Sequence, residues 1–324
     1  MSTIIRVGEV SFGFDVRDLA FWDEETVILV TPAADVWRAV LDPHPRAVEK
    51  LYSGREVNAP LSAAFGKPVE PATGGYPRLA VSARAGVAIV NTHDVVLVAC
   101  PVGIDAGKPR LISEGWGNYD PQIAFSPDGA RFSLMSGGVA VFDTTTWKFG
   151  HDEAAGTCVW HPRAPWTLVL DEGRVGWIDW TDVAKPARHS IGTLEGPEDR
   201  EEPRAVALDP DEGGFLAAYH YPPRLEWWRF DPLRIVHSVE SPHGEILNLV
   251  PGPAGLVAVV GARGTGVWDT RTREPVGGAM DEATGVVFSP SRRRFITRKL
   301  SFSNPYPAHG DTTQCGFDLW QVEI

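Results

Sequence analysis

The sequence has few cysteines and no long apolar run. Its three cysteines, Cys100, Cys158 and Cys315, are odd in number and far apart, unlike a disulfide framework or a zinc ribbon. No apolar stretch approaches the roughly 20 residues that cross a bilayer, and the first residues lack the apolar region of a signal peptide. We therefore expect reduced structural thiols, a cytoplasmic location and no membrane contact.

Basic residues are also scarce. The chain has 30 Lys and Arg against 42 Asp and Glu, which gives a formal net charge of -12. Such a surface repels the phosphate backbone, so nucleic acid is not an expected partner. By contrast, 33 Gly, 27 Pro and 43% hydrophobic residues indicate a globular chain of many short strands joined by tight turns.

Local motifs for catalysis are missing as well. The sequence contains no Gly-x-Ser-x-Gly, His-Glu-x-x-His or paired Cys-x-x-Cys pattern. The glycine-rich segment 261–266 resembles a phosphate-binding loop, but it joins two predicted strands, whereas phosphate binding needs the N-terminus of a following helix. We predict a hairpin turn there. No motif in the sequence indicates a particular reaction, and we expect no cofactor.

A short apolar strand followed by a turn recurs along the chain. Its clearest copy is Ile-Ala-Phe-Ser-Pro-Asp-Gly at 123–129, and further copies lie around Ala83, Pro162, Pro210, Pro251 and Pro290. From Ala83 onward, successive copies lie 35 to 48 residues apart, which brackets the period of about 40 to 45 residues for a four-stranded propeller blade. A seventh copy at 19–23 precedes them, separated by an insertion at 53–78.

A second repeated pattern is a large apolar residue followed by Asp, at the end of the third strand of a unit. It occurs at Leu41-Asp42, Phe142-Asp143, Ile178-Asp179, Phe230-Asp231 and Trp268-Asp269. We expect the apolar side chain to pack between neighbouring units. The Asp carboxylate is expected to accept backbone N–H bonds in the turn that follows.

These repeats resemble the WD-repeat family over nearly the whole chain. Trp268-Asp269 is the dipeptide of that family, and Gly150-His151, 11 residues before Pro162, matches its Gly-His element. The resemblance implies an all-β, seven-bladed β-propeller of four-stranded antiparallel blades, which we treat as one domain over residues 1–324. The last unit, about 285–324, supplies three strands. The N-terminal strand at about 3–10 should complete it, because closure removes an open sheet edge.

In such a propeller, the loops from the fourth strand to the next first strand, and from the second to the third, share one face, here called the top face. The longest loops fall on it and are rich in acidic and aromatic residues, which favours binding a basic or flexible segment of a partner protein. Charge for solubility and aromatics that pack within their own loops are the alternative explanations. The candidate partner-binding residues are Phe65, Tyr76, Trp116, Tyr119, Glu198, Asp199, Tyr221, Arg224, Phe302 and Tyr306.

Histidines in the predicted top loops support a second hypothesis. Groups from several blades could meet at the mouth of the central channel, where a metal ion or acid–base chemistry would serve a lyase, a hydrolase or a small-ligand binder. Its residues are His93, His151, Asp152, His220, His243 and His309. Convergence of three or more of these side chains on one point would favour this second hypothesis. We expect instead a non-catalytic interaction scaffold, because scattered loop histidines are usually solvated.

Overall fold

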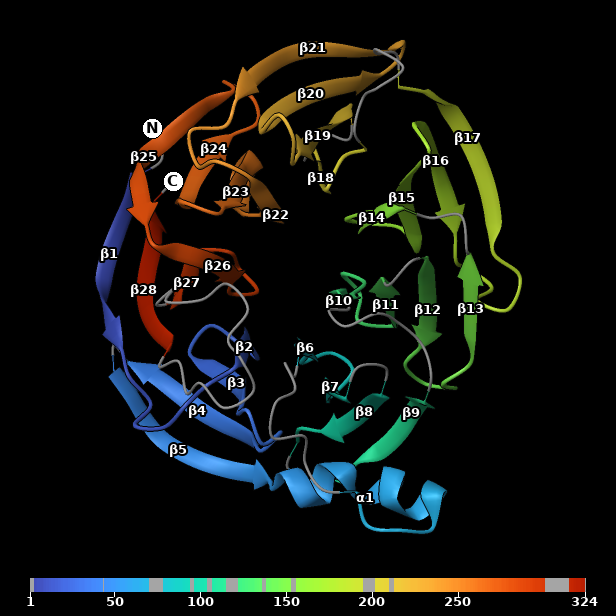
Figure 1. Ribbon diagram of the computed structural model, residues 1–324, viewed down its shortest axis with the longest axis vertical. Coiled ribbons are helices and arrows are strands. Elements are labelled where there is room, and N and C mark those ends of the chain that lie inside the picture. The colour runs from blue at the N-terminus through green and yellow to red at the C-terminus, as the bar shows by residue number, and fades with distance from the viewer. Residues whose placement is uncertain are drawn as a thin grey trace.

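The computed structural model describes residues 3–42, 44–69, 78–93, 96–103, 107–114, 122–135, 138–152, 156–194, 202–209, 213–300 and 315–323. Within these ranges, the chain forms seven four-stranded antiparallel sheets, which are arranged as a ring around a central opening (Figure 1). The predicted seven-bladed propeller is confirmed. No helix in this part of the chain is long and apolar enough to cross a membrane.

In each blade the strands follow one another from the central opening outward (Figure 1). Blade 1 consists of β2 (Asp18–Phe21), β3 (Thr26–Val30), β4 (Val36–Asp42) and β5 (His44–Tyr52). Blade 2 consists of β6 (Leu79–Ser82), β7 (Val87–His93), β8 (Val96–Pro101) and β9 (Arg110–Glu114). Blade 3 consists of β10 (Gln122–Phe125), β11 (Arg131–Met135), β12 (Val139–Asp143) and β13 (Phe149–Asp152). Blade 4 consists of β14 (Thr157–Trp160), β15 (Trp166–Asp171), β16 (Arg174–Asp179) and β17 (Ala187–Thr193). Blade 5 consists of β18 (Ala205–Leu208), β19 (Gly214–Tyr219), β20 (Arg224–Phe230) and β21 (Leu233–Glu240). Blade 6 consists of β22 (Ile246–Pro251), β23 (Leu256–Gly261), β24 (Gly264–Asp269) and β25 (Glu274–Asp281). Blade 7 consists of β26 (Ala283–Phe288), β27 (Arg294–Leu300), β28 (Cys315–Glu323) and β1 (Thr3–Val10).

The two ends of the chain share blade 7. Strand β1 pairs antiparallel with β28, with Thr3 opposite Glu323 and Val10 opposite Phe317. The predicted closure of the ring by the N-terminal strand is therefore confirmed. Beneath this junction, the buried carboxylate of Asp318 accepts hydrogen bonds from Arg6 Nε at 3.1 Å and contacts Lys299 Nζ at 2.9 Å. These contacts link β1, β27 and β28.

The core lies between the blades rather than at the centre of the disc. Side chains of a strand alternate between its two faces, so Leu168 and Leu170 of β15 pack towards Phe215 of blade 5, whereas Val169 packs with Val139 of blade 3. Each blade thus buries both faces against its neighbours. This arrangement explains the nearly continuous apolar strands in the sequence.

Stacked aromatic pairs recur at one position of three blades. Phe132 lies opposite Phe142 in blade 3, with ring centroids 4.8 Å apart. Phe215 and Trp228 in blade 5 are opposed in the same way, as are Phe295 and Trp320 in blade 7, and the rings of all three pairs are within 5° of parallel. Such cross-strand pairs stabilise a sheet beyond their burial.

Three of the five aspartates of this pattern, Asp143, Asp179 and Asp269, hold the turns at the ends of the third strands, as predicted. The Asp143 carboxylate accepts backbone N–H bonds from Thr145 and Thr146 at 3.0 and 2.7 Å. Asp179 and Asp269 accept equivalent bonds in blades 4 and 6. Partial burial raises the pKa of Asp143, but these hydrogen bonds outweigh it and hold the pKa below its usual range.

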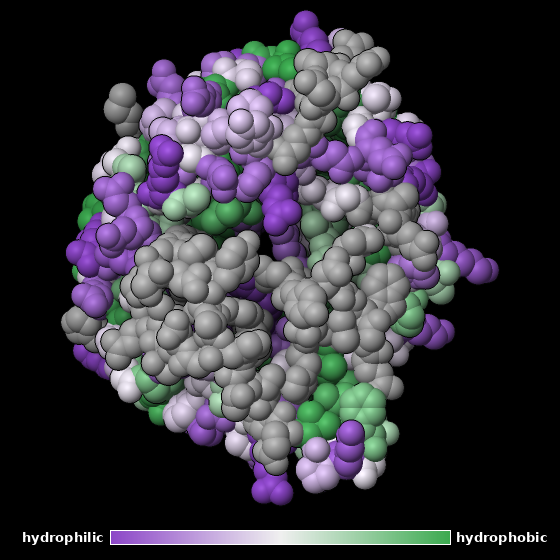
Figure 2. All heavy atoms as spheres, in the orientation of Figure 1, coloured by the Kyte–Doolittle hydropathy of each residue, from purple (hydrophilic) through white to green (hydrophobic). Residues whose placement is uncertain are grey.

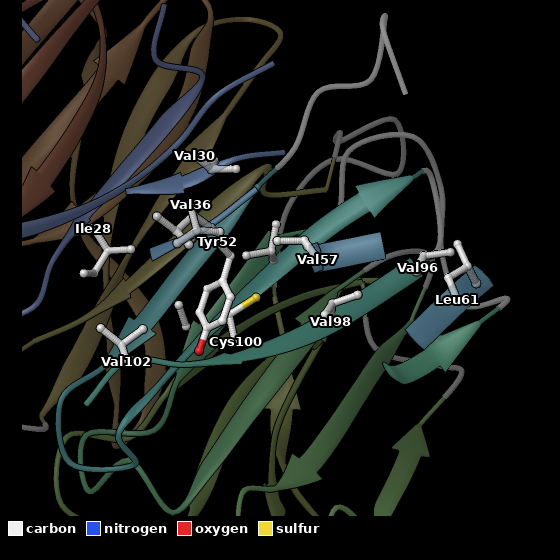
Figure 3. Close-up of a cluster of buried hydrophobic side chains, with 13 residues drawn as sticks. Ile28, Val30, Val36, Tyr52, Val57, Leu61, Val96, Val98, Cys100 and Val102 are labelled. Atoms are coloured by element: carbon white, nitrogen blue, oxygen red, sulfur yellow. The ribbon is translucent and has the colours of Figure 1, made fainter. Parts of the chain in front are cut away.

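The insertion at 53–78 differs from the expected top-face loop, because it begins with helix α1 (Gly54–Phe65). Ser53 caps the helix, and the Glu56 carboxylate accepts the Ser53 N–H at 2.8 Å. Val57 and Leu61, one turn apart, pack with Val96 and Val98 of blade 2 (Figure 3). The first half of the insertion therefore lies at the outer rim of blades 1 and 2 (Figure 1).

Candidate partner-binding face

Figure 2 shows the top face, which has a central hollow with strongly hydrophilic residues at its margin. Of the predicted partner-binding residues, Phe65 and Tyr221 have described side chains that are 54% and 76% exposed. They lie far apart, since Phe65 ends α1 beside blade 2 whereas Tyr221 lies in the β19–β20 turn across the ring (Figure 1). Seven other predicted residues lie outside the described ranges: Tyr76, Trp116, Tyr119, Glu198, Asp199, Phe302 and Tyr306.

The turn that carries Tyr221 stands on a buried polar network. Arg224 lies over the ring of Tyr219, 4.4 Å from its centroid, and its Nε is 3.0 Å from Glu226 Oε1. Trp228 Nε1 donates to the other oxygen of Glu226 at 3.2 Å. A buried carboxylate is stable only with such partners. Arg224, a predicted binding residue, is therefore engaged in holding the base of the turn.

A neighbouring contact joins this turn to blade 6. His220 Nε2 lies 3.7 Å from Glu245 Oε2, and the carbonyl oxygen of Glu245 accepts the N–H of Ala262 at 2.9 Å. Beyond Glu245, a β-bulge in β22 leaves Leu247 outside the pairing and 38% exposed. We call His220, Tyr221, Glu245 and Leu247 the blade 5–6 surface.

His243 fills a space made by two glycines. The predicted hairpin at 261–266 is confirmed, since β23 and β24 pair up to Gly261 opposite Gly264. The side chain of His243 is buried against it, and a Cβ added to Gly266 would stand 2.2 Å from His243 Nε2. Burial lowers the pKa of His243, and the nearby charge of Asp281 offsets this only in part. His243 is thus a neutral packing residue at neutral pH.

The remaining residues of the metal hypothesis are spread over the ring. His93 ends β7 in blade 2, and His151 and Asp152 lie on β13, the outermost strand of blade 3. His309 lies outside the described ranges. Among the residues that the structure describes, no three His, Cys, Asp or Glu side chains form a group that could hold a metal ion. The described residues therefore give the channel hypothesis no support.

Two cysteines are described with their side chains, Cys100 and Cys158, and both are free thiols. Burial raises the pKa of Cys100 and brings that of Cys158 to about 12. Because the thiolate is the nucleophile, these groups are inert near neutral pH. The expectation of structural thiols is met at both positions.

Comparison with solved structures finds the WD40 β-propeller domain of Doa1, with a TM-score of 0.66 and 12% sequence identity, covering 99% of this chain and 97% of that chain. No family model and no curated protein matches the sequence. At this level of identity the likeness concerns the fold. It agrees with the WD-repeat resemblance of the sequence.

Proposed function

We propose that this chain is a non-catalytic scaffold that binds a partner protein through its top face. The exposed ring of Tyr221, raised on the Arg224–Glu226–Trp228 network, carries the proposal. An aromatic residue on a rigid base loses little side-chain entropy when it is covered, which is why Tyr and Trp dominate interface hot spots. In this proposal the closed ring acts as one domain.

The partner in this proposal is a protein with a basic or flexible segment. The chain carries a net charge of -12, and Glu245, Asp281 and Glu282 are exposed at the top ends of blades 5 and 6. Opposite charge on a partner would speed its association and fix its orientation. The free thiols of Cys100 and Cys158 support a reducing, cytoplasmic location.

The test is capture of partners from a lysate of the source cell, followed by mass spectrometry. Tyr221→Ala combined with Trp116→Ala and Tyr119→Ala should reduce capture about tenfold or more, because hot-spot truncation costs about 2 kcal/mol. Phe149→Ala is the matched control, because Phe149 is a 48% exposed aromatic residue on the outermost strand of blade 3. Equal capture by the triple variant and the wild type would refute the top-face assignment.

A further inference from the structure

Leu247 is an apolar side chain in an unusual place. Among the large apolar residues of the described chain that are exposed, it alone lies on the innermost strand of a blade. Its neighbours Ile246 and Leu249 are buried, as is the whole of the equivalent strand β18. Leu247 therefore offers an exposed apolar contact on the innermost strand of blade 6, whereas the large apolar side chains described on the other innermost strands are buried or partly buried.

The exposure of Leu247 is built into the local structure. Ile246 pairs with Gly261 and Asn248 with Val260, so Leu247 is the extra residue of a β-bulge. A bulge turns a side chain away from the regular alternation. The chain before it is fixed, since Arg263 N donates to His243 O at 3.0 Å and Ala262 N donates to Glu245 O. The surface is thus formed before any partner arrives.

Exposed charges at the top ends of blades 5 and 6 are mainly negative. At the top ends of blades 5 and 6, the exposed charged residues of the described chain are the acids Glu202, Glu240, Glu245, Asp281 and Glu282 against the bases Arg204 and Arg263. The resulting excess of three negative charges attracts a cation. Figure 2 shows a small apolar area beside the central hollow, with hydrophilic residues along part of its border.

Tyr221 adds an aromatic face to this environment. It is 76% exposed, and the preceding residue, His220, contacts Glu245. The tyrosine ring attracts a Lys or Arg side chain placed over it, and the Glu245 carboxylate, on a side chain that is 56% exposed, can pair with the same cation. Leu247, the apolar contact, therefore follows Glu245, the acidic contact, by two residues in the chain.

We infer that the blade 5–6 surface binds an extended peptide segment in which a Lys or Arg lies close to an apolar residue. The basic side chain pairs with Glu245 beside the ring of Tyr221, and the apolar side chain covers Leu247. This inference rests on the proposed function, because it specifies the partner segment of the same face.

The test is selection from a phage library that displays random 12-residue peptides, with the full chain immobilised. Peptides that carry Lys or Arg close to an apolar residue should be enriched. The affinity of a selected peptide should fall about tenfold or more for Leu247→Ser and for Glu245→Lys, and should weaken as salt is raised.

Matched controls separate a local effect from a general one. Ile235→Ser changes a residue with the same 38% exposure on the outermost strand β21, and Glu274→Lys reverses an exposed charge at the start of β25. Both controls should bind the peptide like the wild type. If Leu247→Ser does not fold, Glu245→Lys decides the test, because the side chain of Glu245 is exposed.

Several outcomes would overturn the inference: no enrichment at all, enrichment without Lys or Arg, or equal affinity for Glu245→Lys and wild type. The proposed function is tested apart from this. A different result is that the selected peptides lack Lys and Arg and yet bind Tyr221→Ala more weakly than the wild type. That result would leave the scaffold proposal standing and would overturn only the inference that the bound segment is basic. Unchanged lysate capture by the triple top-face variant would remove the scaffold proposal itself.

Discussion

Individual residues in this propeller are fixed by contacts that a single added atom would disturb. Gly266 is the clearest case, because His243 occupies the space where a side chain would begin. We predict that Gly266→Ala lowers the free energy of unfolding by about 1 to 3 kcal/mol, the usual cost of overpacking. Urea denaturation followed by circular dichroism measures it.

Gly213→Ala is the control for this change, since nothing lies within 4 Å of its added Cβ. Equal stability of the two glycine variants would show that His243 moves aside without cost.

Asp318 should make the stability of the folded chain depend on pH. Burial raises its pKa, but the hydrogen bonds and charges of Lys299 and Arg6 outweigh this and hold the pKa below its usual range. A carboxyl with a lower pKa in the folded state contributes stability above its unfolded pKa, and this contribution is lost as pH falls through the folded pKa. The wild type should therefore lose more stability between pH 5 and pH 3 than Asp318→Asn does.

At pH 7, Asp318→Asn should be less stable by about 2 kcal/mol, a value below that for a fully buried pair because Arg6 and Lys299 are partly exposed. Urea midpoints at pH 7, 5 and 3 give both quantities. Parallel loss of stability in the two proteins on acidification would exclude Asp318 as the source.

Residue roles were predictable where they depend on nearby sequence. The carboxylates of Asp143, Asp179 and Asp269 bind the turn that directly follows them, so the local pattern was sufficient. The exposure of Leu247 was not predictable, because the segment Ile-Leu-Asn-Leu-Val at 246–250 has the composition of an ordinary buried strand. Its bulge depends on register with Gly261, which no local pattern encodes.

At the scale of elements, α1 shows how a repeat pattern can hide a helix. Ser53 and Glu56 form a capping box, and Val57 and Leu61 have helical spacing, so the signal was present in the sequence. The repeat assigned this stretch to a top loop because it separates two blades. The seven four-stranded blades and the closure of the last one were predicted correctly, because the blades repeat the same local signals.

Helix α1 should depend on Leu61 for its attachment to the rim. Leu61→Ala removes a side chain that is 2% exposed. This change should lower the free energy that holds the packed helix on the ring by about 2 to 5 kcal/mol. Hydrogen exchange should then quicken in 54–65 while the strands of blades 4 to 6 keep their protection.

Phe65→Ala serves as the comparison, since this side chain is 54% exposed and its loss should leave exchange in the helix unchanged. Uniform quickening over all blades in Leu61→Ala would mean that α1 and the ring unfold together.

For the whole molecule, closure of blade 7 by β1 should decide whether the ring is stable. Deleting residues 1–10 removes β1 and exposes the edge of β28. An uncovered edge invites pairing with other chains, so this variant should aggregate and lose its cooperative thermal transition. Calorimetry and light scattering test this. A cooperative transition like that of the wild type would show that the ring does not need β1.

Hydrogen exchange of the chain with and without a captured partner tests most directly whether the top face is the binding face. The proposal predicts new protection at 219–224 and 241–247, the top ends of blades 5 and 6, and unchanged exchange in the opposite turns at 144–148 and 270–273. Protection confined to those opposite turns, or to the outermost strands, would contradict it.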